Sequence, residues 1–292
     1  MRIIFDRSAF HGDNFEVLQG SPLLKLTGRG ALQVFLTPVF LNETLTSYGS
    51  KRPVQWRQQL SYALDVCNGG IFLDKMDIWR EELIMGRGRL ARHLMPEKPN
   101  RRYWSRPQFV ASLRQVVKTG DLDQEWVDSQ EERDDAYQKS MRQKAISAEA
   151  RQEAVRRLGG TPTPTDLAKY PFSAFRATEL VRTGAHLMSL VDPRRALALT
   201  DQWARSPGDF PFFTAFVEGF LYNGYYATLE HAERLDRNAQ ADYEQLAYLL
   251  WADLVISNDT TFFTRAFETV WRPRGKRLES TTSFVELLKR MA

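Results

Sequence analysis

The stretch Arg2-Ile3-Ile4-Phe5-Asp6 is a short apolar run that ends on a carboxylate. Its length and continuous apolar character are typical of a strand that is buried on both faces of a parallel sheet. A second run of this kind, Val34–Pro38, follows a partly helical stretch and leads into a helix predicted over residues 39–45. The alternation of strand and helix predicts a parallel α/β unit.

The same alternation continues to residue 74 and returns near the C-terminal end. A helix is predicted over Val54–Val66, and the turn signal Asn68-Gly69-Gly70 precedes a third strand at Ile71–Leu73. The later part predicts, in order, a helix, a strand, a helix, a short strand and a closing helix, over residues 241–251, 253–257, 262–270, 277–278 and 281–291. We therefore expect an α/β fold with a parallel sheet flanked by helices.

The middle of the chain has a different, mainly helical pattern. Helices are predicted over residues 139–158, 166–189, 193–205 and 210–225. The last of these carries a stripe of four phenylalanines, which we interpret as core rather than as a ligand-stacking surface: Phe212, Phe213, Phe216 and Phe220. The simplest organisation is a core formed by residues 1–85 and 215–292, interrupted by a helical insertion over residues 86–214.

The charge of the chain is nearly balanced in total but not locally. The 292 residues include 40 Lys and Arg against 36 Asp and Glu, a net charge of +4. Residues 86–107 hold seven basic side chains and one acidic one, whereas residues 121–135 hold eight acidic side chains and one basic one. The location of the charge, rather than its total, therefore bears on partners.

Several classes of protein are excluded by composition. The single cysteine, Cys67, excludes a disulfide framework and a multi-thiolate metal site, and the four histidines lack the spacing of a zinc site. His11, five residues after Asp6, is interpreted as a loop residue rather than a catalytic base. No apolar run approaches the roughly 18 residues of a membrane span, and the first residues lack a signal-peptide pattern. We expect a cytoplasmic protein without a membrane partner.

Four carboxylates are expected at one edge of the predicted sheet. Asp6 and Asp259 each follow a strand, Glu43 lies on the helix after the second strand, and Asp242 lies on the helix that precedes the strand of Asp259. Ligands of open parallel sheets bind beyond the carboxyl ends of the strands. Hard cations prefer carboxylate oxygen, so this set predicts a site for Mg²⁺ or Mn²⁺. Asp253 competes with Asp242, but a residue at the start of a strand lies at the opposite edge.

These residues, in this order, resemble the PIN-domain nucleases. The resemblance rests on Ile3-Ile4-Phe5-Asp6, on Leu36-Thr37-Pro38 with Glu43, on Asp242, on Val255-Ile256-Ser257-Asn258-Asp259 with Phe262-Phe263, and on the closing segment 277–288. It covers roughly the first 80 and the last 60 residues, and the middle is not accounted for by it.

The resemblance implies an activity and a set of site residues. Asp6, Glu43, Asp242 and Asp259 take the positions of the family's catalytic and metal-binding acids, and Ser257 matches its small hydroxyl residue. The expected activity is that of a metal-dependent endoribonuclease. The resemblance suggests a toxin-like or defence-associated nuclease, for which an inhibitor protein is an implied partner, or an RNA-processing enzyme. The alternative is a noncatalytic module, binding nucleic acid or protein, on a PIN-like core.

The basic segment is the candidate for contact with RNA. Lys and Arg side chains neutralise phosphates and release counterions, and the expected contact residues are Arg87, Arg89, Arg101, Arg102 and Arg106. Tyr103 and Trp104 lie among them and are candidates for stacking on unpaired bases. Pairing of Arg101 and Arg102 with the acidic block 121–135 is an equally open alternative.

Overall fold

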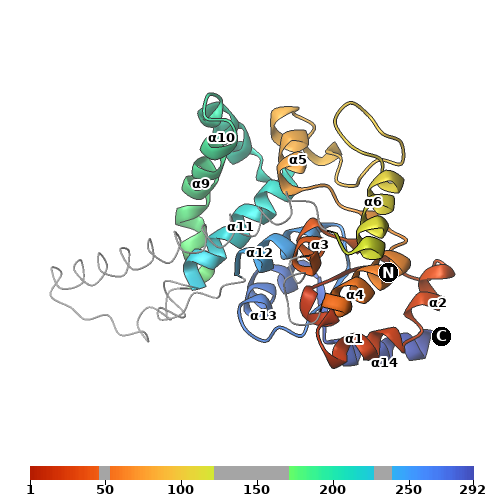
Figure 1. The fold of residues 1–292 in the computed structure, drawn as a ribbon. Coiled ribbons are helices and arrows are strands. Elements are labelled where there is room, and N and C mark those ends of the chain that lie inside the picture. Colours follow the sequence, from red (N-terminus) through yellow and green to blue (C-terminus); the bar gives the residue numbers. More distant parts are fainter. Residues whose placement is uncertain (46–52, 122–170, 227–238) are drawn as a thin grey trace.

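The computed structural model describes residues 1–45, 53–121, 171–226 and 239–292 (Figure 1). Five strands form one all-parallel sheet in the order β3-β2-β1-β4-β5. The strands are β1 (Arg2–Phe5), β2 (Gln33–Leu36), β3 (Gly70–Ile71), β4 (Leu254–Ile256) and β5 (Arg277–Glu279). The expected α/β class and the five expected strands are confirmed.

The central strand β1 explains why the chain begins with an uninterrupted apolar run. Ile4 is paired with Phe35 of β2 on one side and with Val255 of β4 on the other. Ile3 and Ile4 are both fully buried, but they belong to two different core clusters. Successive side chains of a strand point to opposite faces, so both faces of this sheet are covered.

Helices pack on both faces of the sheet. In the N-terminal half these are η1 (Arg7–Phe10), α1 (Asp13–Gln19), α2 (Leu23–Gly28), α3 (Pro38–Leu45), α4 (Pro53–Val66), α5 (Lys75–Trp79), the π-helix η3 (Arg80–Ile84), η4 (Gly88–Leu90) and α6 (Arg106–Thr119). In the C-terminal half they are α9 (Phe172–Val191), α10 (Ala196–Arg205), η5 (Pro207–Asp209), α11 (Pro211–Tyr225), α12 (Ala239–Ala247), η7 (Tyr248–Leu250), α13 (Phe262–Ala266), η8 (Phe267–Trp271), η9 (Arg272–Arg274) and α14 (Thr281–Met291).

The two faces are covered by different parts of the chain. The core on the side of Ile3 and Phe5 is filled from α1, α2, α4 and α14. The core on the side of Ile4 and Val255 is filled mainly from α9 to α13, of which α9, α10 and α11 lie away from α1 and α14 (Figure 1). The middle of the chain therefore contributes directly to one layer of the fold.

Helix α11 joins this middle region to the sheet. Phe212, Phe213 and Phe216 are buried, and Phe220 packs against the same cluster, which confirms that the stripe is core. The helix packs against both α9 and α12. It also runs through the domain boundary predicted at residue 214. The division into domains stays a prediction. The helix predicted over residues 139–158 and nearly all of the acidic block 121–135 lie outside the described residues.

Buried carboxylates fix α11 at two points. At its start, both carboxylate oxygens of Glu82 accept hydrogen bonds from the backbone N–H groups of Phe212 and Phe213, each at 2.9 Å. Further along, the buried carboxylate of Glu218 forms ion pairs with Arg176 of α9 and with Arg274 near the C-terminal end. A buried carboxylate is stable only when it is hydrogen-bonded or paired. These contacts therefore hold α11 against segments that are distant in sequence.

Replacing Glu82 with Gln should remove a pH-dependent part of the free energy of unfolding. Burial raises the pKa of Glu82 to about 7, compared with about 4.3 in an unfolded chain. The folded state therefore binds this proton more tightly, and the stability that it contributes at low pH is lost as the pH rises through 7.

Urea unfolding at pH 5 and at pH 8 measures this effect. The free energy of unfolding of the wild type, relative to Glu82→Gln, should be lower at pH 8 by up to about 3 kcal/mol. Glu286→Gln, at an exposed position of α14, is the matched control. An equal change in the control, or a pH-independent difference for Glu82→Gln, would contradict the role assigned to Glu82.

Candidate functional site

The expected acidic edge lies where the order of strands reverses. The chain runs from β1 to β2 and β3 on one side, and then returns to β4 and β5 on the other side of β1. In open α/β sheets this point opens a crevice beyond the carboxyl ends of the two strands. Asp6 follows β1 directly, and Ser257, Asn258 and Asp259 follow β4. The loops after β1 and β4 therefore meet at the position where a ligand is expected.

Asp6 is the buried centre of this edge. Only 6% of the residue is exposed. One carboxylate oxygen, Oδ2, accepts hydrogen bonds from the N–H of Ser8 at 3.1 Å, from the Ser8 hydroxyl, and from the Ser257 hydroxyl at 2.8 Å. Burial raises the pKa of Asp6, and the hydrogen bonds from Ser8 and Ser257 oppose that rise. The two serines thus fix the orientation of the Asp6 carboxylate. They also stabilise its charged form, which burial disfavours.

Ser8 and Asn258 complete the network, although neither was expected from the sequence as a site residue. The Asn258 N–H donates to the Ser8 hydroxyl at 2.8 Å. The Asn258 amide donates to the Thr281 hydroxyl at 2.7 Å and accepts from the Thr281 N–H at 3.1 Å. The only local signal was a small polar residue beside each strand-end Asp, which is also typical of ordinary turns.

Asp259 faces its own loop. Its carboxylate accepts hydrogen bonds from the N–H of Thr261 at 2.7 Å and from the Thr261 hydroxyl at 2.9 Å. Its backbone N–H donates to the Ser257 hydroxyl at 3.1 Å, so the same hydroxyl contacts both Asp6 and the backbone of Asp259. Asp259 is therefore joined to Asp6 through Ser257.

Asp242 is positioned by a neighbour on its own helix. Gln245 of α12 donates to the carbonyl of Phe5 at 2.8 Å and accepts a hydrogen bond from the Thr37 hydroxyl. Helix α12 is thereby fixed to the ends of β1 and β2. Asp242 precedes Gln245 by three residues, so it lies on the same side of the helix. Asp242 lies nearer the start of α12 than Gln245 does, by about one helical turn, and therefore farther beyond the carboxyl ends of the strands. Its side chain is buried.

Glu43 approaches this edge together with an arginine. Arg7 follows Asp6 directly, and its guanidinium donates to Gln59 Oε1 at 2.7 Å. Burial lowers the pKa of Arg7, while the negative charges of Glu43 and Asp6 act in the opposite direction. Helix α3, which carries Glu43, packs against η1, which carries Arg7. A cationic side chain is therefore close to two of the four carboxylates.

The four carboxylates share one edge but do not stand as a ligand set. Among residues 1–45, 53–121, 171–226 and 239–292, no group of three or more His, Cys, Asp or Glu side chains is placed to hold a metal ion. The oxygen chemistry suits Mg²⁺ or Mn²⁺, but the arrangement of the side chains does not fit a bound ion. The physical reasons lie in their other contacts: Asp6 is bound by two serines, Asp259 by Thr261, and Glu43 lies near Arg7.

The competing residue Asp253 lies at the opposite edge of the sheet. It precedes β4, and its carboxylate forms an ion pair with Arg2, at the start of β1, at 2.8 Å. Its backbone N–H also donates to the carbonyl of Arg2. Because the strands are parallel, these contacts belong to the amino ends of β1 and β4, as expected.

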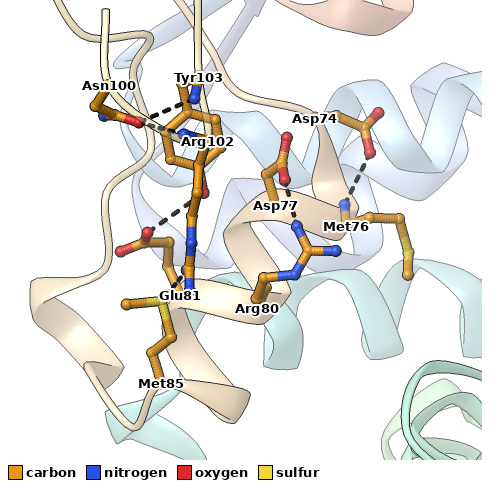
Figure 2. Close-up of polar contacts among 9 residues, drawn as sticks. All are labelled: Asp74, Met76, Asp77, Arg80, Glu81, Met85, Asn100, Arg102 and Tyr103. Atoms are coloured by element: carbon orange, nitrogen blue, oxygen red, sulfur yellow. Dashed lines mark hydrogen bonds and ion pairs between the residues drawn. The ribbon is translucent and has the colours of Figure 1, made fainter.

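Most of the expected RNA-contacting arginines have partners within the protein. Arg87 pairs with Glu81, Arg89 with Asp209 at 3.3 Å, and Arg106 with Glu97 at 2.8 Å. Arg101 and Arg102 are exposed, and the Arg102 guanidinium lies on the sulfur of Met85 (Figure 2). Their proposed partners at residues 122–135 lie outside the described part of the chain.

The expectation of base stacking is wrong for Tyr103 and stays a prediction for Trp104. Tyr103 is 7% exposed and donates a hydrogen bond to Glu81, so it is not available for stacking on a base. Trp104 is 62% exposed. The sequence could not separate the two, because adjacent aromatic residues carry the same composition signal and differ only in how the loop packs.

Replacing Asp6 with Asn should leave the free energy of unfolding at pH 7 unchanged or raise it. Because the folded-state pKa of Asp6 is raised by burial, the stability linked to this group is present at low pH and is lost as the pH rises. Asn is neutral, has the same shape, and keeps an oxygen to accept from the serines.

Asp253→Asn is the same substitution at the other edge and should act in the opposite direction. The side-chain hydrogen bond from Arg2 lowers the pKa of Asp253, and loss of this half-exposed pair should cost about 0.2–1 kcal/mol. Thermal and urea unfolding compare the two variants. A loss of stability for Asp6→Asn as large as that for Asp253→Asn would show that Asp6 is mainly a structural residue.

Comparison with known proteins identifies no relative of this chain. No protein-family model matches its sequence, and no curated protein or solved structure matches it significantly. Within the described residues, no helix is long and apolar enough to cross a membrane. Support for a function therefore comes from the acidic edge and from the residues around it.

Proposed function

We propose that the protein is a metal-dependent nuclease with a PIN-like fold, which hydrolyses phosphodiester bonds in RNA. The observation that carries the proposal is the buried carboxylate of Asp6, held by Ser8 and Ser257 at the point where the strand order reverses. A buried carboxylate that burial makes harder to ionise is unfavourable for stability and is typical of functional sites.

The fold is compatible with the proposed family. The all-parallel sheet is flanked by helices, and the chain places Asp6 after the central strand β1 and Asp259 after its neighbour β4. In this proposal residues 1–85 and 215–292 form the PIN-like core, and residues 86–214 form a helical insertion. The contacts of α11 with both α9 and α12 make the insertion part of one packed layer rather than a separate body.

Asp6, Glu43, Asp242 and Asp259 are the proposed ligands for Mg²⁺ or Mn²⁺. Such an ion, when bound, would supply positive charge for the phosphate and an activated water. Ser8 and Ser257 orient the Asp6 carboxylate, and Gln245 positions the helix that carries Asp242. Because the carboxylates do not form a ligand set in the described arrangement, the proposal requires Glu43, Asp242 and Asp259 to turn toward Asp6.

The lack of a ligand set among the described carboxylates favours one alternative function. A PIN-like core that cannot assemble its carboxylates would serve as a noncatalytic module that binds nucleic acid or protein. In that case Arg7, which lies near Glu43 and Asp6, would balance their charge permanently. The two functions differ in one measurable property, which is divalent-metal-dependent cleavage.

The test is degradation of a labelled RNA by the full chain with Mg²⁺, with Mn²⁺ and with EDTA. Asp6→Asn and Asp259→Asn should each reduce the cleavage rate to the background of the EDTA reaction. Ser257→Ala should reduce it by about 10- to 100-fold, as expected when an orienting partner of a metal ligand is lost. Asp253→Asn, at the opposite edge, should cleave like the wild type.

Two outcomes would overturn the nuclease assignment. One is the absence of metal-dependent cleavage by the wild type, which would leave the noncatalytic module. The other is undiminished cleavage by Asp6→Asn and Asp259→Asn, which would place any activity elsewhere. If expression of the wild type, but not of Asp6→Asn, arrests growth of the host cells, the result would support the toxin-like role and an inhibitor protein as a partner.

A further inference from the structure

The loop between residues 97 and 105 is held rigidly by its own hydrogen bonds. The side-chain oxygen of Asn100 accepts from the N–H groups of Arg102 and Tyr103, at 2.8 and 2.9 Å, and the Asn100 N–H donates to the Tyr103 carbonyl at 3.0 Å. Figure 2 shows this turn beside Glu81 and Met85. The loop therefore has a defined backbone conformation.

Buried residues anchor the loop on both sides of Trp104. The Tyr103 hydroxyl donates to Glu81 at 3.3 Å. Ser105 is 3% exposed and caps α6, forming a capping box with Gln108. Between these anchors the Trp104 side chain remains 62% exposed. A large indole ring that is left in solvent by a rigid loop has an apolar face available for a partner.

Three cationic side chains of this loop are exposed and unpaired within the described residues. Lys98, Arg101 and Arg102 are exposed, and none of the three forms an ion pair with a carboxylate in the described part of the chain. Arg87 and Arg106, by contrast, are paired with Glu81 and Glu97. The loop that carries the exposed indole ring therefore also carries three exposed cations, one of which, Arg102, contacts the sulfur of Met85.

A chain of contacts links this loop to the helix that carries Asp242. Helix α5 begins after β3, and its Lys75 forms an ion pair with Glu244 of α12, two residues after Asp242. The next turn, η3, carries Glu81, which contacts Tyr103. The loop is therefore connected, through α5 and α12, to the carboxyl edge at which Asp6 lies.

We infer that Trp104, with Lys98, Arg101 and Arg102, forms a docking surface for an unpaired stretch of RNA. A base stacks on the indole ring, and the cations contact the flanking phosphates, as in other sites for single strands. A duplex hides the faces of its bases, so it cannot use the ring. The inference rests on the proposed function for its choice of RNA, but it concerns binding rather than cleavage.

Binding is measured in EDTA, so that it is separate from cleavage, using the fluorescence anisotropy of a labelled single-stranded RNA 20-mer of mixed sequence. Trp104→Ala and Trp104→Leu should weaken binding by about 5- to 100-fold. Trp104→Phe, which keeps an aromatic face, should retain most of the affinity. Thermal unfolding should be nearly unchanged in all three, because the side chain is largely exposed.

The cationic part is tested by the salt dependence of the same binding. Arg101→Gln combined with Arg102→Gln should reduce the slope of log K against log salt by about 1 to 2. The matched control is Arg182→Gln with Arg205→Gln, two arginines on α9 and α10, which should leave the slope unchanged. If the two double variants have the same slope of log K against log salt, Arg101 and Arg102 do not contact phosphates, and the role of the loop in binding is overturned.

Other outcomes separate the surface from the nuclease proposal. Unchanged RNA affinity in Trp104→Ala overturns the docking surface and leaves the nuclease proposal standing. Loss of affinity in Trp104→Ala, together with no metal-dependent cleavage by the wild type, supports the surface and overturns the nuclease. The same measurement is made with the RNA duplex and with a single-stranded DNA of the same sequence. The inference is also overturned if Trp104→Ala weakens binding of the duplex as much as binding of the single strand, or if the protein binds the DNA but not the RNA.

Discussion

The carboxylate of Asp6 is buried at the end of the central strand, and the loops around it are arranged to satisfy it. Ser8 supplies an N–H and a hydroxyl, Ser257 supplies a second hydroxyl, and Asn258 ties these loops to the start of α14 through Thr281. Burial of a charged group is unfavourable unless hydrogen bonds replace its water. The network therefore holds the ends of β1 and β4 and the segment after β5 in one arrangement, with a carboxylate at its centre.

Other buried carboxylates have a different role, which is to join helices that are distant in sequence. Glu82 caps the start of α11, and Glu218 binds Arg176 and Arg274 from two other segments. Lys75 and Glu244 connect α5 with α12. The net charge of +4 therefore does not reveal that several acidic side chains are buried, where backbone N–H groups or basic side chains bind them.

The two proposals concern two parts of the molecule, the acidic edge and the basic loop. The edge has carboxylates from four separate elements, with the Arg7 guanidinium near two of them, and the loop has an exposed ring among cations. The positive charge of Arg7 favours the ionised forms of Glu43 and Asp6. In the proposed nuclease, a divalent ion would have to compete with the Arg7 guanidinium for these carboxylates.

Much of the secondary structure and the location of the candidate acids could be predicted from the sequence, because both depend on local pattern. The run ending at Asp6, the run ending before Ser257 and the turn at Asn68 each identify a strand from neighbouring residues alone. What only the tertiary structure decided depends on contacts between residues distant in the chain: the order of the strands, the burial of Asp6 against Ser257, and the place of Arg7 beside Glu43. The same holds for Tyr103 and Trp104, which are adjacent in sequence, yet one is buried against Glu81 and the other is exposed, because packing acts on each side chain separately.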